Sequence, residues 1–460
     1  MSPIYRAEAH LLSFGAEAAD GTDPGTSVLT FPPGVWETAT LPDWEADFLP
    51  KWYLGSASLR NWYSIFRGKK ILSGSIPDML VLNGSIFKWG LGSVTTEGTD
   101  VGGGGGGVID TGAVLKGATT VNTSLIANYT ANDFVQIGTV TTGVGANAEA
   151  RRITTVNVHG DGTGDLVLNY PLSFAHALGE TLNEVTVPYT HRVLETNVLD
   201  TMTMHVTYED SEQTAANRFM RRWHGGKVNR MSFKGDEGEP LRVSWDEILF
   251  RDLSHNQRFH SAIGGGAANI TKYAAGVAQP TVMNHLLTPA YPITEPYYFS
   301  QANLTLFGVT FARLRHFLLE ANNNIEARYY IQDNSGAGQI PAATQEHRKE
   351  YRLAATIAMP DAVAAATSTV RTMFKELLLE GNYTAGFTGF DISLVFTRGA
   401  SDTITFTIPP SAAATGGDAQ GAFIRAAKHN IVTESPVQVD VEAIFRSMRV
   451  TIVDSLAEYP

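Results

Sequence analysis

Residues of the types that bind phosphate or metal ions occur at two places in the 460-residue chain. The six consecutive glycines of Gly102–Gly107 contain the spacing of a dinucleotide-binding turn, but no buried strand precedes them, no helix follows and no Gly-Lys-Ser/Thr is adjacent. His159–Asp165 offers carboxylates to calcium, but it lacks the third acidic ligand and the closing glutamate of a calcium-binding loop. We therefore expect a hinge or surface loop at the glycines and a turn between two strands at His159–Asp165.

Sequence patterns of hydrolytic enzymes are also missing. The 12 histidines include no His-Glu-x-x-His and no close pair at metal-binding spacing. Gly55-Ser56 and Gly84-Ser85 lack the Gly-x-Ser-x-Gly elbow and an adjacent base. The absence of cysteine excludes disulfides, thiolate zinc sites, iron–sulfur clusters and cysteine nucleophiles. The sequence therefore predicts a protein that is not an enzyme, with no catalytic residues, no cofactor and no metal site.

The densest basic and aromatic segment is Arg221–Lys227, with the sequence RRWHGGK. Such a segment suits contact with nucleic acid or with an acidic partner. The whole chain, however, has 34 Lys and Arg against 46 Asp and Glu, a net charge of -12 that repels nucleic acid. We therefore favour a solvated hairpin or a salt bridge between subunits at this segment.

The composition points to a soluble protein that associates with other chains. Hydrophobic residues make up 43% of the sequence, but charged residues only 17%, below the roughly 25% of an ordinary globular protein. A low charge fraction suggests a surface that is covered, most simply by copies of the same chain. No signal peptide and no apolar run of membrane-spanning length is present, so we expect synthesis in a cytoplasm and no membrane contact.

Alternating apolar and polar residues predict a mainly β protein. Strands with one buried face are expected at Thr201–Tyr208, Lys227–Phe233, Leu241–Trp245, Asp391–Phe396 and Thr403–Ile408. Helical patterns are few. The clearest covers Thr367–Glu380, with Val370, Met373, Phe374, Leu377 and Leu378 on one face, and a weaker one covers Asp78–Trp89. Val309–Ala321 fits a helix or a strand.

A change of texture marks an inserted domain. Beyond the glycine run, short alternating strands at Phe134–Gly138, Arg152–Val156 and Asp165–Leu168 are separated by glycine-rich turns. We interpret residues 96–187 as an inserted β-rich surface domain, a small barrel or sandwich. Such insertions are tolerated at loop tips because closing a longer loop costs little extra entropy.

The two parts of the chain outside this insertion repeat one order of elements. Pro240–Arg251 and Pro436–Arg446 share Pro-x-x-Val followed by acidic, Ile, Phe and Arg positions, while Lys69–Asp78 and Tyr351–Asp361 each lead into a predicted helix. Chance similarity is the alternative to a tandem duplication. The duplication assigns residues 1–95 plus 188–275 to a first domain and 276–460 to a second. Three such chains would build a pseudo-sixfold ring.

A long segment with little core pattern precedes each predicted helix. Trp36–Lys70 holds four of the seven tryptophans, and Glu320–Glu350 contains the segment Arg328–Gln332 and the loop Asn334–Gly338. These tryptophans could form an ordinary core cluster. They could equally belong to an extended arm that docks on a neighbouring subunit, because aromatic residues are enriched at the cores of interfaces.

An ordered set of segments resembles the tail tube proteins of long-tailed bacteriophages, in particular the major tail tube proteins of siphovirus type in a tandem-repeat form. The segments are Gly15–Glu17, Gly21-Thr22, Gly74–Ile76, His191–Tyr208, Trp223–Asn229, Met231–Gly235, Pro240–Trp245 and Arg251-Asp252. The resemblance covers most of the chain outside the insertion. It implies tandem β-sandwich-plus-helix domains that assemble into rings, whose inner strands form a continuous barrel. Stacked rings would form a hollow tube that conducts the genome into the host.

The resemblance also implies the partners. It implies homotrimeric rings, or homohexameric rings as the alternative, together with a tape measure protein inside the tube, tail terminator and baseplate or tip proteins, and genomic DNA that passes without specific binding. The location would be the virion tail, assembled in the host cytoplasm. An acidic wall would suit a DNA conduit, since it repels phosphate. The extra β domain and the glycine run depart from the family pattern. Another virion protein, from the baseplate or a capsid decoration, or a carbohydrate-binding or carbohydrate-active β-sandwich protein is the alternative.

Overall fold

The computed structural model describes most of the chain as a β protein. The described residues are 11–21, 33–42, 45–51, 64–101, 106–139, 147–208, 219–256, 270–272, 295–306, 309–311, 314–329, 341, 343–358, 389–399, 402–409, 420–430, 438–457 and 459. Within them there is one short α-helix, α1 (Lys88–Leu91), and three single turns of 3-10 helix, η3 (Gly84–Phe87), η4 (Ile126–Asn128) and η8 (Phe299–Gln301). None of the helices in the described part of the chain has the length and hydrophobicity of a membrane span.

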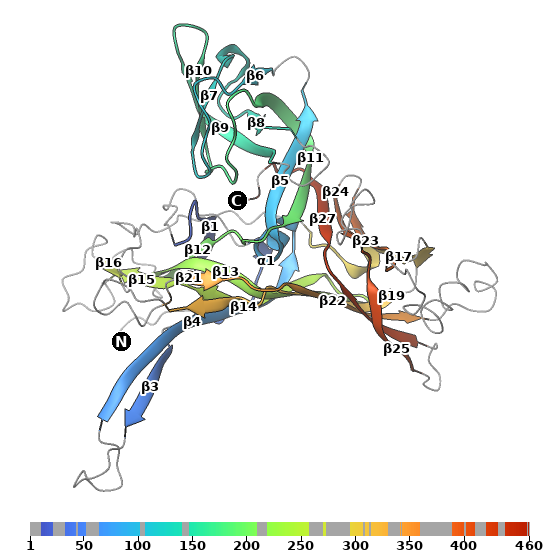
Figure 1. The fold of residues 1–460 in the computed structure, drawn as a ribbon. Helices are drawn as coiled ribbons and strands as arrows, with labels where there is room; N and C mark the ends of the chain where they lie inside the picture. The colour runs from blue at the N-terminus through green and yellow to red at the C-terminus, as the bar shows by residue number, and fades with distance from the viewer. Residues whose placement is uncertain are drawn as a thin grey trace, which may run out of the picture.

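The larger sheet runs through both halves of the chain (Figure 1). Its main path is β2 (Gly34–Val35), β4 (Ser64–Val81), β14 (Arg242–Phe250), β13 (Phe219–Asp236), β19 (Leu314–Asn322), β22 (Glu350–Ala358), β26 (Gln438–Phe445) and β25 (Phe423–Asn430). Side branches are β3 (Glu45–Lys51) on β4, β12 (Met202–Tyr208) and β15 (Asp252–Asn256) on β13, β1 (Leu11–Ala16) on β12, and β16 (Ile270–Lys272) on β15. We call the main path the long sheet.

The second sheet packs over the long sheet and continues into the inserted region. It follows β18 (Val309–Phe311), β17 (Ala302–Leu306), β23 (Ile392–Arg398), β24 (Asp402–Ile408), β27 (Arg449–Asp454) and β11 (Thr181–Glu195), with β5 (Gly92–Asp100) also paired to β11. It goes on through β8 (Phe134–Ile137), β9 (Glu149–Val158), β10 (Gly164–Leu168) and β7 (Thr120–Thr123). A separate hairpin joins β20 (Glu326–Arg328) to β21 (Ala343–Gln345).

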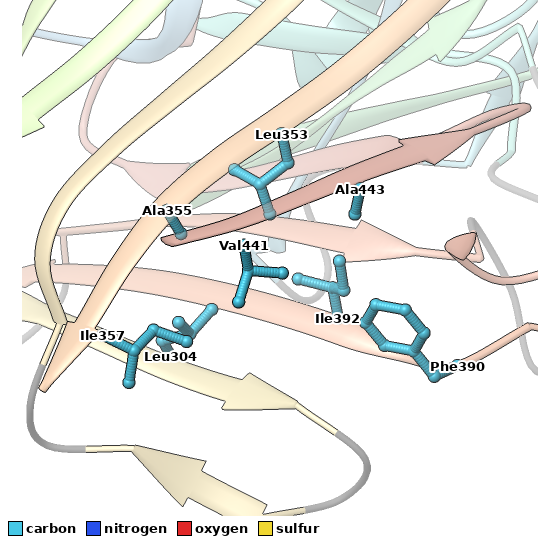
Figure 2. A pocket seen from close by; sticks show the side chains of 8 residues that line it. All are labelled: Leu304, Leu353, Ala355, Ile357, Phe390, Ile392, Val441 and Ala443. Carbon is cyan, nitrogen blue, oxygen red and sulfur yellow. The ribbon is translucent and has the colours of Figure 1, made fainter. Parts of the chain in front are cut away.

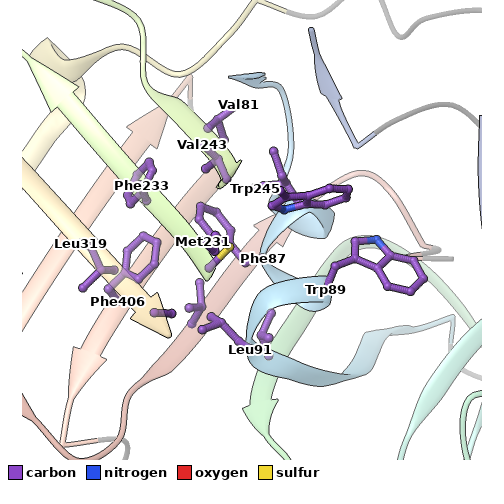
Figure 3. Close-up of a cluster of buried hydrophobic side chains, with 14 of the residues drawn as sticks. Val81, Phe87, Trp89, Leu91, Met231, Phe233, Val243, Trp245, Leu319 and Phe406 are labelled. Carbon is purple, nitrogen blue, oxygen red and sulfur yellow. The ribbon is translucent and has the colours of Figure 1, made fainter. Parts of the chain in front are cut away.

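Aromatic side chains from both sheets meet in one core (Figure 3). Phe87, at the end of η3, lies 5.2 Å from Phe233 of β13 and 5.1 Å from Phe406 of β24, ring centre to ring centre and edge to face. Phe233 and Phe406 stack at 5.1 Å. All three rings are buried, and Phe406 comes from the second half of the chain. The connection between β4 and β5 therefore contributes a ring that joins the two halves.

The predicted strands are confirmed, and the one segment that fitted either a helix or a strand is resolved. Thr201–Tyr208, Asp391–Phe396 and Thr403–Ile408 fall in β12, β23 and β24, and the other two fall in β13 and β14. Val309–Ala321 forms β18 and β19, because Phe317, Leu319 and Ala321 are buried at a period of two.

The weaker helix prediction was wrong over its first half. Asp78–Val81 completes β4, since Met79 and Val81 alternate into the core, and helical turns start only at Gly84. Asn83 starts them because its side-chain oxygen accepts a hydrogen bond from the Ser85 amide. The predicted helix Thr367–Glu380 lies outside the described residues.

The inserted region forms a small closed barrel (Figure 1). Its strands follow the order β6 (Gly107–Val108), β11, β8, β9, β10 and β7, and a bridge between Ile109 and Thr123 closes β7 onto β6. A hydrophobic cluster of its own, including Val121, Val135 and Leu166, fills the interior. The paired strands β5 and β11 are the stem that connects the barrel to the rest of the two sheets, which we call the body.

The glycine run lies partly within this barrel. Gly102–Gly105 is outside the described residues, whereas Gly107 belongs to β6, so the expectation of a hinge or surface loop was wrong for Gly107. A Cβ at Gly107 would lie 2.5 Å from the Thr123 hydroxyl, which explains the need for glycine where these strands approach.

Candidate assembly surfaces

The segment His159–Asp165 is the turn between β9 and β10, as expected. Asp161 accepts hydrogen bonds from the Thr163 amide at 3.0 Å and from the Thr163 hydroxyl at 2.6 Å, and His159 lies 3.3 Å from Asp165. The carboxylate of Asp161 thus closes the turn. Nowhere in the described residues do three or more His, Asp or Glu side chains gather as metal ligands would.

Buried charged side chains form ion pairs and hydrogen bonds at one end of the barrel. Both His176 ring nitrogens face carboxylates, with Nε2 2.9 Å from Glu149 and Nδ1 2.8 Å from Glu180. Arg151 forms a 2.6 Å ion pair with Glu149. The Glu149 carboxylate also accepts a hydrogen bond from the Ser173 amide. Burial alone would lower the pKa of His176, but the two carboxylates outweigh it and raise this pKa. Contact of both ring nitrogens with carboxylates therefore fixes the segment before β11.

A second charged group ties the barrel to the body. Asp200 lies 2.9 Å from Lys116 of the barrel and 4.0 Å from Lys88 of α1. Burial lowers the pKa of Lys88 to about 8, although Asp200 opposes the shift. The barrel is thus attached at this contact as well as through its stem.

The prediction of a solvated hairpin at Arg221–Lys227 was wrong. The segment lies inside β13, where Arg222 and His224 are fully buried. Arg222 donates a hydrogen bond to His205, and Lys227 forms a 2.7 Å ion pair with Glu346. These charges are therefore paired within the chain. His205 lies on the neighbouring strand β12, and Glu346 comes from the second half of the chain.

The repeated motifs occupy equivalent places in the two halves of the long sheet. The order β2–β4–β14–β13 in the first half matches β19–β22–β26–β25 in the second. Val243 of the first Pro-x-x-Val pairs with Met79 on β4, and Val439 of the second pairs with Ile357 on β22. The last residues of β14 and β26 are both phenylalanine. They occupy equivalent positions, because Phe250 pairs with β4 and Phe445 pairs with β22.

In the long sheet the two halves meet at one seam, where β13 pairs with β19 from Arg230↔Asn322 to Asp236↔His316, and in the second sheet they meet where β11 pairs with β27. Asn323, which is fully buried, donates from its side-chain nitrogen to the carbonyls of Gly90 and Val228, each at 2.9 Å. Both hydrogen atoms of this side-chain nitrogen are therefore used, although the Asn323 side-chain oxygen is buried without a hydrogen-bond partner among the described residues. The Lys227–Glu346 pair lies at the same seam, since Glu346 follows β21. Buried hydrogen bonds of this kind fix the relative position of two elements. The seam is therefore a specific junction.

The outer face of the long sheet carries charges of both signs. Arg352 on β22 lies 3.1 Å from Glu320 on β19 and 3.0 Å from Glu442 on β26, and Glu442 lies 3.4 Å from Arg425 on β25. Partial burial raises the pKa of Asp246 on this face, and the charge of Glu320 adds to the shift. Carboxylates thus compensate the arginines along a row that crosses four strands.

A two-stranded arm extends from the first half of the long sheet (Figure 1). It consists of β3 and the beginning of β4, and it exposes Phe48 by 58%, Leu49 by 42% and Ile65 by 45%. Isolated two-stranded hairpins are marginally stable in water, and exposed apolar patches of this kind mark interaction sites. Among the tryptophans of this segment, Trp36 packs against the core, while the other three lie outside the described residues.

The corresponding segment of the second half packs on the first half. Its hairpin β20–β21 is followed by Glu346 at the seam, and the Tyr329 hydroxyl donates to the Lys70 carbonyl at 2.7 Å. The segment therefore shows, within one chain, how an arm of one repeat lies on the neighbouring repeat.

A small apolar gap lies between the two sheets in the second half (Figure 2). The side chains around it are all hydrocarbon: Leu304, Leu353, Ala355, Ile357, Phe390, Ile392, Val441 and Ala443. Such a lining offers no nucleophile, acid, base or ligand for a metal ion. We therefore treat the gap as a packing feature and the surfaces above as the functional ones.

Comparisons with known proteins agree with this choice. Residues 77–441 match the family described as phage tail tube protein, which spans more than half of the chain. A search of curated proteins finds no individual match.

Proposed function

Because the chain belongs to the phage tail tube protein family, we propose that three copies close each ring of the tube and that the rings stack into a hollow conduit. The protein is a structural subunit that self-assembles into a bacteriophage tail tube. The finer features that follow extend this family assignment to the number of chains, the lumen, the inserted barrel and the partners.

The observation that supports three chains per ring is the seam at which β13 pairs with β19. It joins two equivalent four-stranded units edge to edge in one continuous sheet. If each unit occupies one of the six positions in a pseudo-sixfold ring, one chain occupies two positions and three chains complete the ring. Closing the sheet into a ring also removes the strand edges at its ends, which would otherwise promote aggregation.

The proposed lumen surface is the outer face of the long sheet, and genomic DNA passes along it without specific binding. Support comes from the row of Glu320, Arg352, Glu442 and Arg425, in which each arginine lies near a carboxylate. Neutralised arginines release few counterions from DNA, so they hold it weakly. The expected lumen is therefore a surface of paired charges, and this refines the acidic wall expected from net charge alone.

The proposed domain division is 1–95 plus 188–275, 96–187, and 276–460. The barrel rises on the side of the second sheet, away from the outer face of the long sheet (Figure 1), so it would decorate the outside of the tube.

The other partners proposed from the family are a tape measure protein in the lumen and terminator and baseplate proteins at the tube ends. Location in the virion tail after assembly in the host cytoplasm, and the lack of enzyme activity, follow from the same assignment.

Electron microscopy of the purified chain tests this function. Negative staining should show rings or hollow filaments with a continuous central channel. A monodisperse monomer over a series of protein and salt concentrations would contradict self-assembly, and would favour a decorating or carbohydrate-binding role.

A further inference from the structure

The stem contains an irregularity between the body and the barrel. Figure 1 shows β5 and β11 rising together from the body into the barrel. Their pairing shifts register between Thr186 and Thr190, so residues 187–189 of β11 lie opposite Gly98 of β5 alone. Extra residues in one strand interrupt the hydrogen bonding of the pair and bend the strand. We call this place the joint, and the stem alone does not fix the angle of the barrel there.

The residues that follow β27 are anchored on the body beside the joint. We call residues 455–457 and Tyr459 the strap. The His191 ring of β11 stacks on the Tyr459 ring at 3.7 Å between ring centres, and its Nε2 donates to the Leu456 carbonyl at 2.7 Å. The Tyr459 hydroxyl donates a hydrogen bond to Asp454, the last residue of β27. Tyr459 is only 3% exposed, so a large buried ring holds the strap in place.

The strap also contacts the barrel. Ala457 of the strap is 5% exposed and belongs to one apolar cluster with Ala150 on β9 and with Val185 and Tyr189 of the stem. Phe134 on β8 packs against the same cluster. The strap therefore bridges the body and the barrel across the joint, with Tyr459 on the body side and Ala457 on the barrel side.

We propose that the strap is a brace that sets the angle of the barrel on the body, with Tyr459 as the positioning residue. While Tyr459 is seated on His191, Ala457 supports the barrel beside the joint, and the barrel holds one orientation. In the proposed tube, every barrel would then face its surroundings in the same way. The brace itself is a contact within one chain, so it does not depend on the number of chains in a ring.

Two other contacts keep the barrel attached when the strap is released. Lys116 of the barrel lies 2.9 Å from Asp200, and the Thr96 amide donates to the Ala148 carbonyl at 2.8 Å. The Lys116 side chain is 43% exposed, and ion pairs of this kind contribute little. Release of the strap should therefore let the barrel sample a range of angles without unfolding it.

Distances between two spin labels test the brace, since the chain has no native cysteine. Val158→Cys places one label on the barrel, where Val158 is 71% exposed, and Ile444→Cys places the other on β26, where Ile444 is 44% exposed. Labelled full-length chains are diluted into unlabelled chains, so that pulsed electron paramagnetic resonance reports distances within one chain. The native chain should give one narrow distribution. Tyr459→Ala should broaden it by about twofold or more, because the strap opens locally.

Three further variants separate the brace from general stability. Tyr459→Phe keeps the stacked ring and should stay narrow, whereas Ala457→Glu keeps the anchor, places a charge against the barrel and should broaden the distribution. Leu178→Ala, at a barrel position that is 59% exposed, should match the native chain. Circular dichroism and hydrogen exchange of the β8 and β9 amides should be unchanged, which distinguishes movement from unfolding. If Tyr459→Ala fails to fold, Ala457→Glu decides, and a distribution as narrow as the native one in the folded variants would overturn the proposal.

Discussion

At the scale of single residues, His176 gives the barrel a pH-dependent stability. The raised pKa means that the folded barrel holds this proton more tightly than the unfolded chain, whose value is about 6.5. The stabilisation is fully present below pH about 6.5 and is lost as pH rises through the higher folded value. We expect the unfolding temperature of the barrel to fall over that interval.

The matched variants for this test are His176→Gln and His159→Gln. The first should abolish the pH step, whereas the second should leave it unchanged, because the His159 side chain is 44% exposed and exposed ion pairs contribute little. Hydrogen exchange of the β8 and β9 amides, measured between pH 5 and pH 9, would follow the barrel apart from the body. A pH step that survives in His176→Gln would contradict this account.

Loss of the Phe87 ring should strongly destabilise the body. Phe87→Ala removes a ring that is fully buried between Phe233 and Phe406, so the free energy of unfolding should fall by about 3–5 kcal/mol. Urea unfolding of the monomer measures it. Phe48→Ala is the control with an exposed ring and should change monomer stability by less than about 0.5 kcal/mol. Equal losses in the two variants would exclude a special role for Phe87.

At the scale of elements, the barrel should be removable without loss of the tube. Asp100 and Val185 are paired across the stem, so a two-residue Asn-Gly turn placed between them closes the hairpin directly. The second half already has a short turn at this place, between Arg398 of β23 and Asp402 of β24. Micrographs of the shortened chain should show tubes of smaller outer diameter. Loss of tubes would mean that the barrel bridges subunits.

The sequence predicted the elements whose pattern is local and missed those that depend on distant partners. Alternation located β12, β23 and β24, because one buried face imposes a period of two. It could not show that Arg222 and Lys227 are buried, since this depends on how β12 packs on β13 and on Glu346, which lies far along the chain. The prediction of the weaker helix was wrong over its first half because the strand β4 continues through Asp78. In this segment the apolar residues fit both the alternation of a strand and the spacing of a helix.

At the scale of the whole molecule, the paired charges of the proposed lumen predict a weak interaction with DNA. Glu442→Gln removes a carboxylate shared by Arg352 and Arg425, so assembled tubes should retain more DNA at low salt. The excess should disappear as salt rises, because phosphate contacts weaken with ionic strength. Glu350→Gln, an exposed residue on the same sheet, is the control. Filtration of labelled duplex DNA with assembled tubes measures retention, and equal retention by all tubes would argue against this lumen.

The proposed duplication explains the low charge fraction as surface that neighbouring subunits cover, and it requires three chains in each ring. Native mass measurement of a single ring tests it most directly. The account predicts the mass of three chains of 49.7 kDa, with six repeat units visible in averaged end views. A ring with the mass of six chains would contradict it.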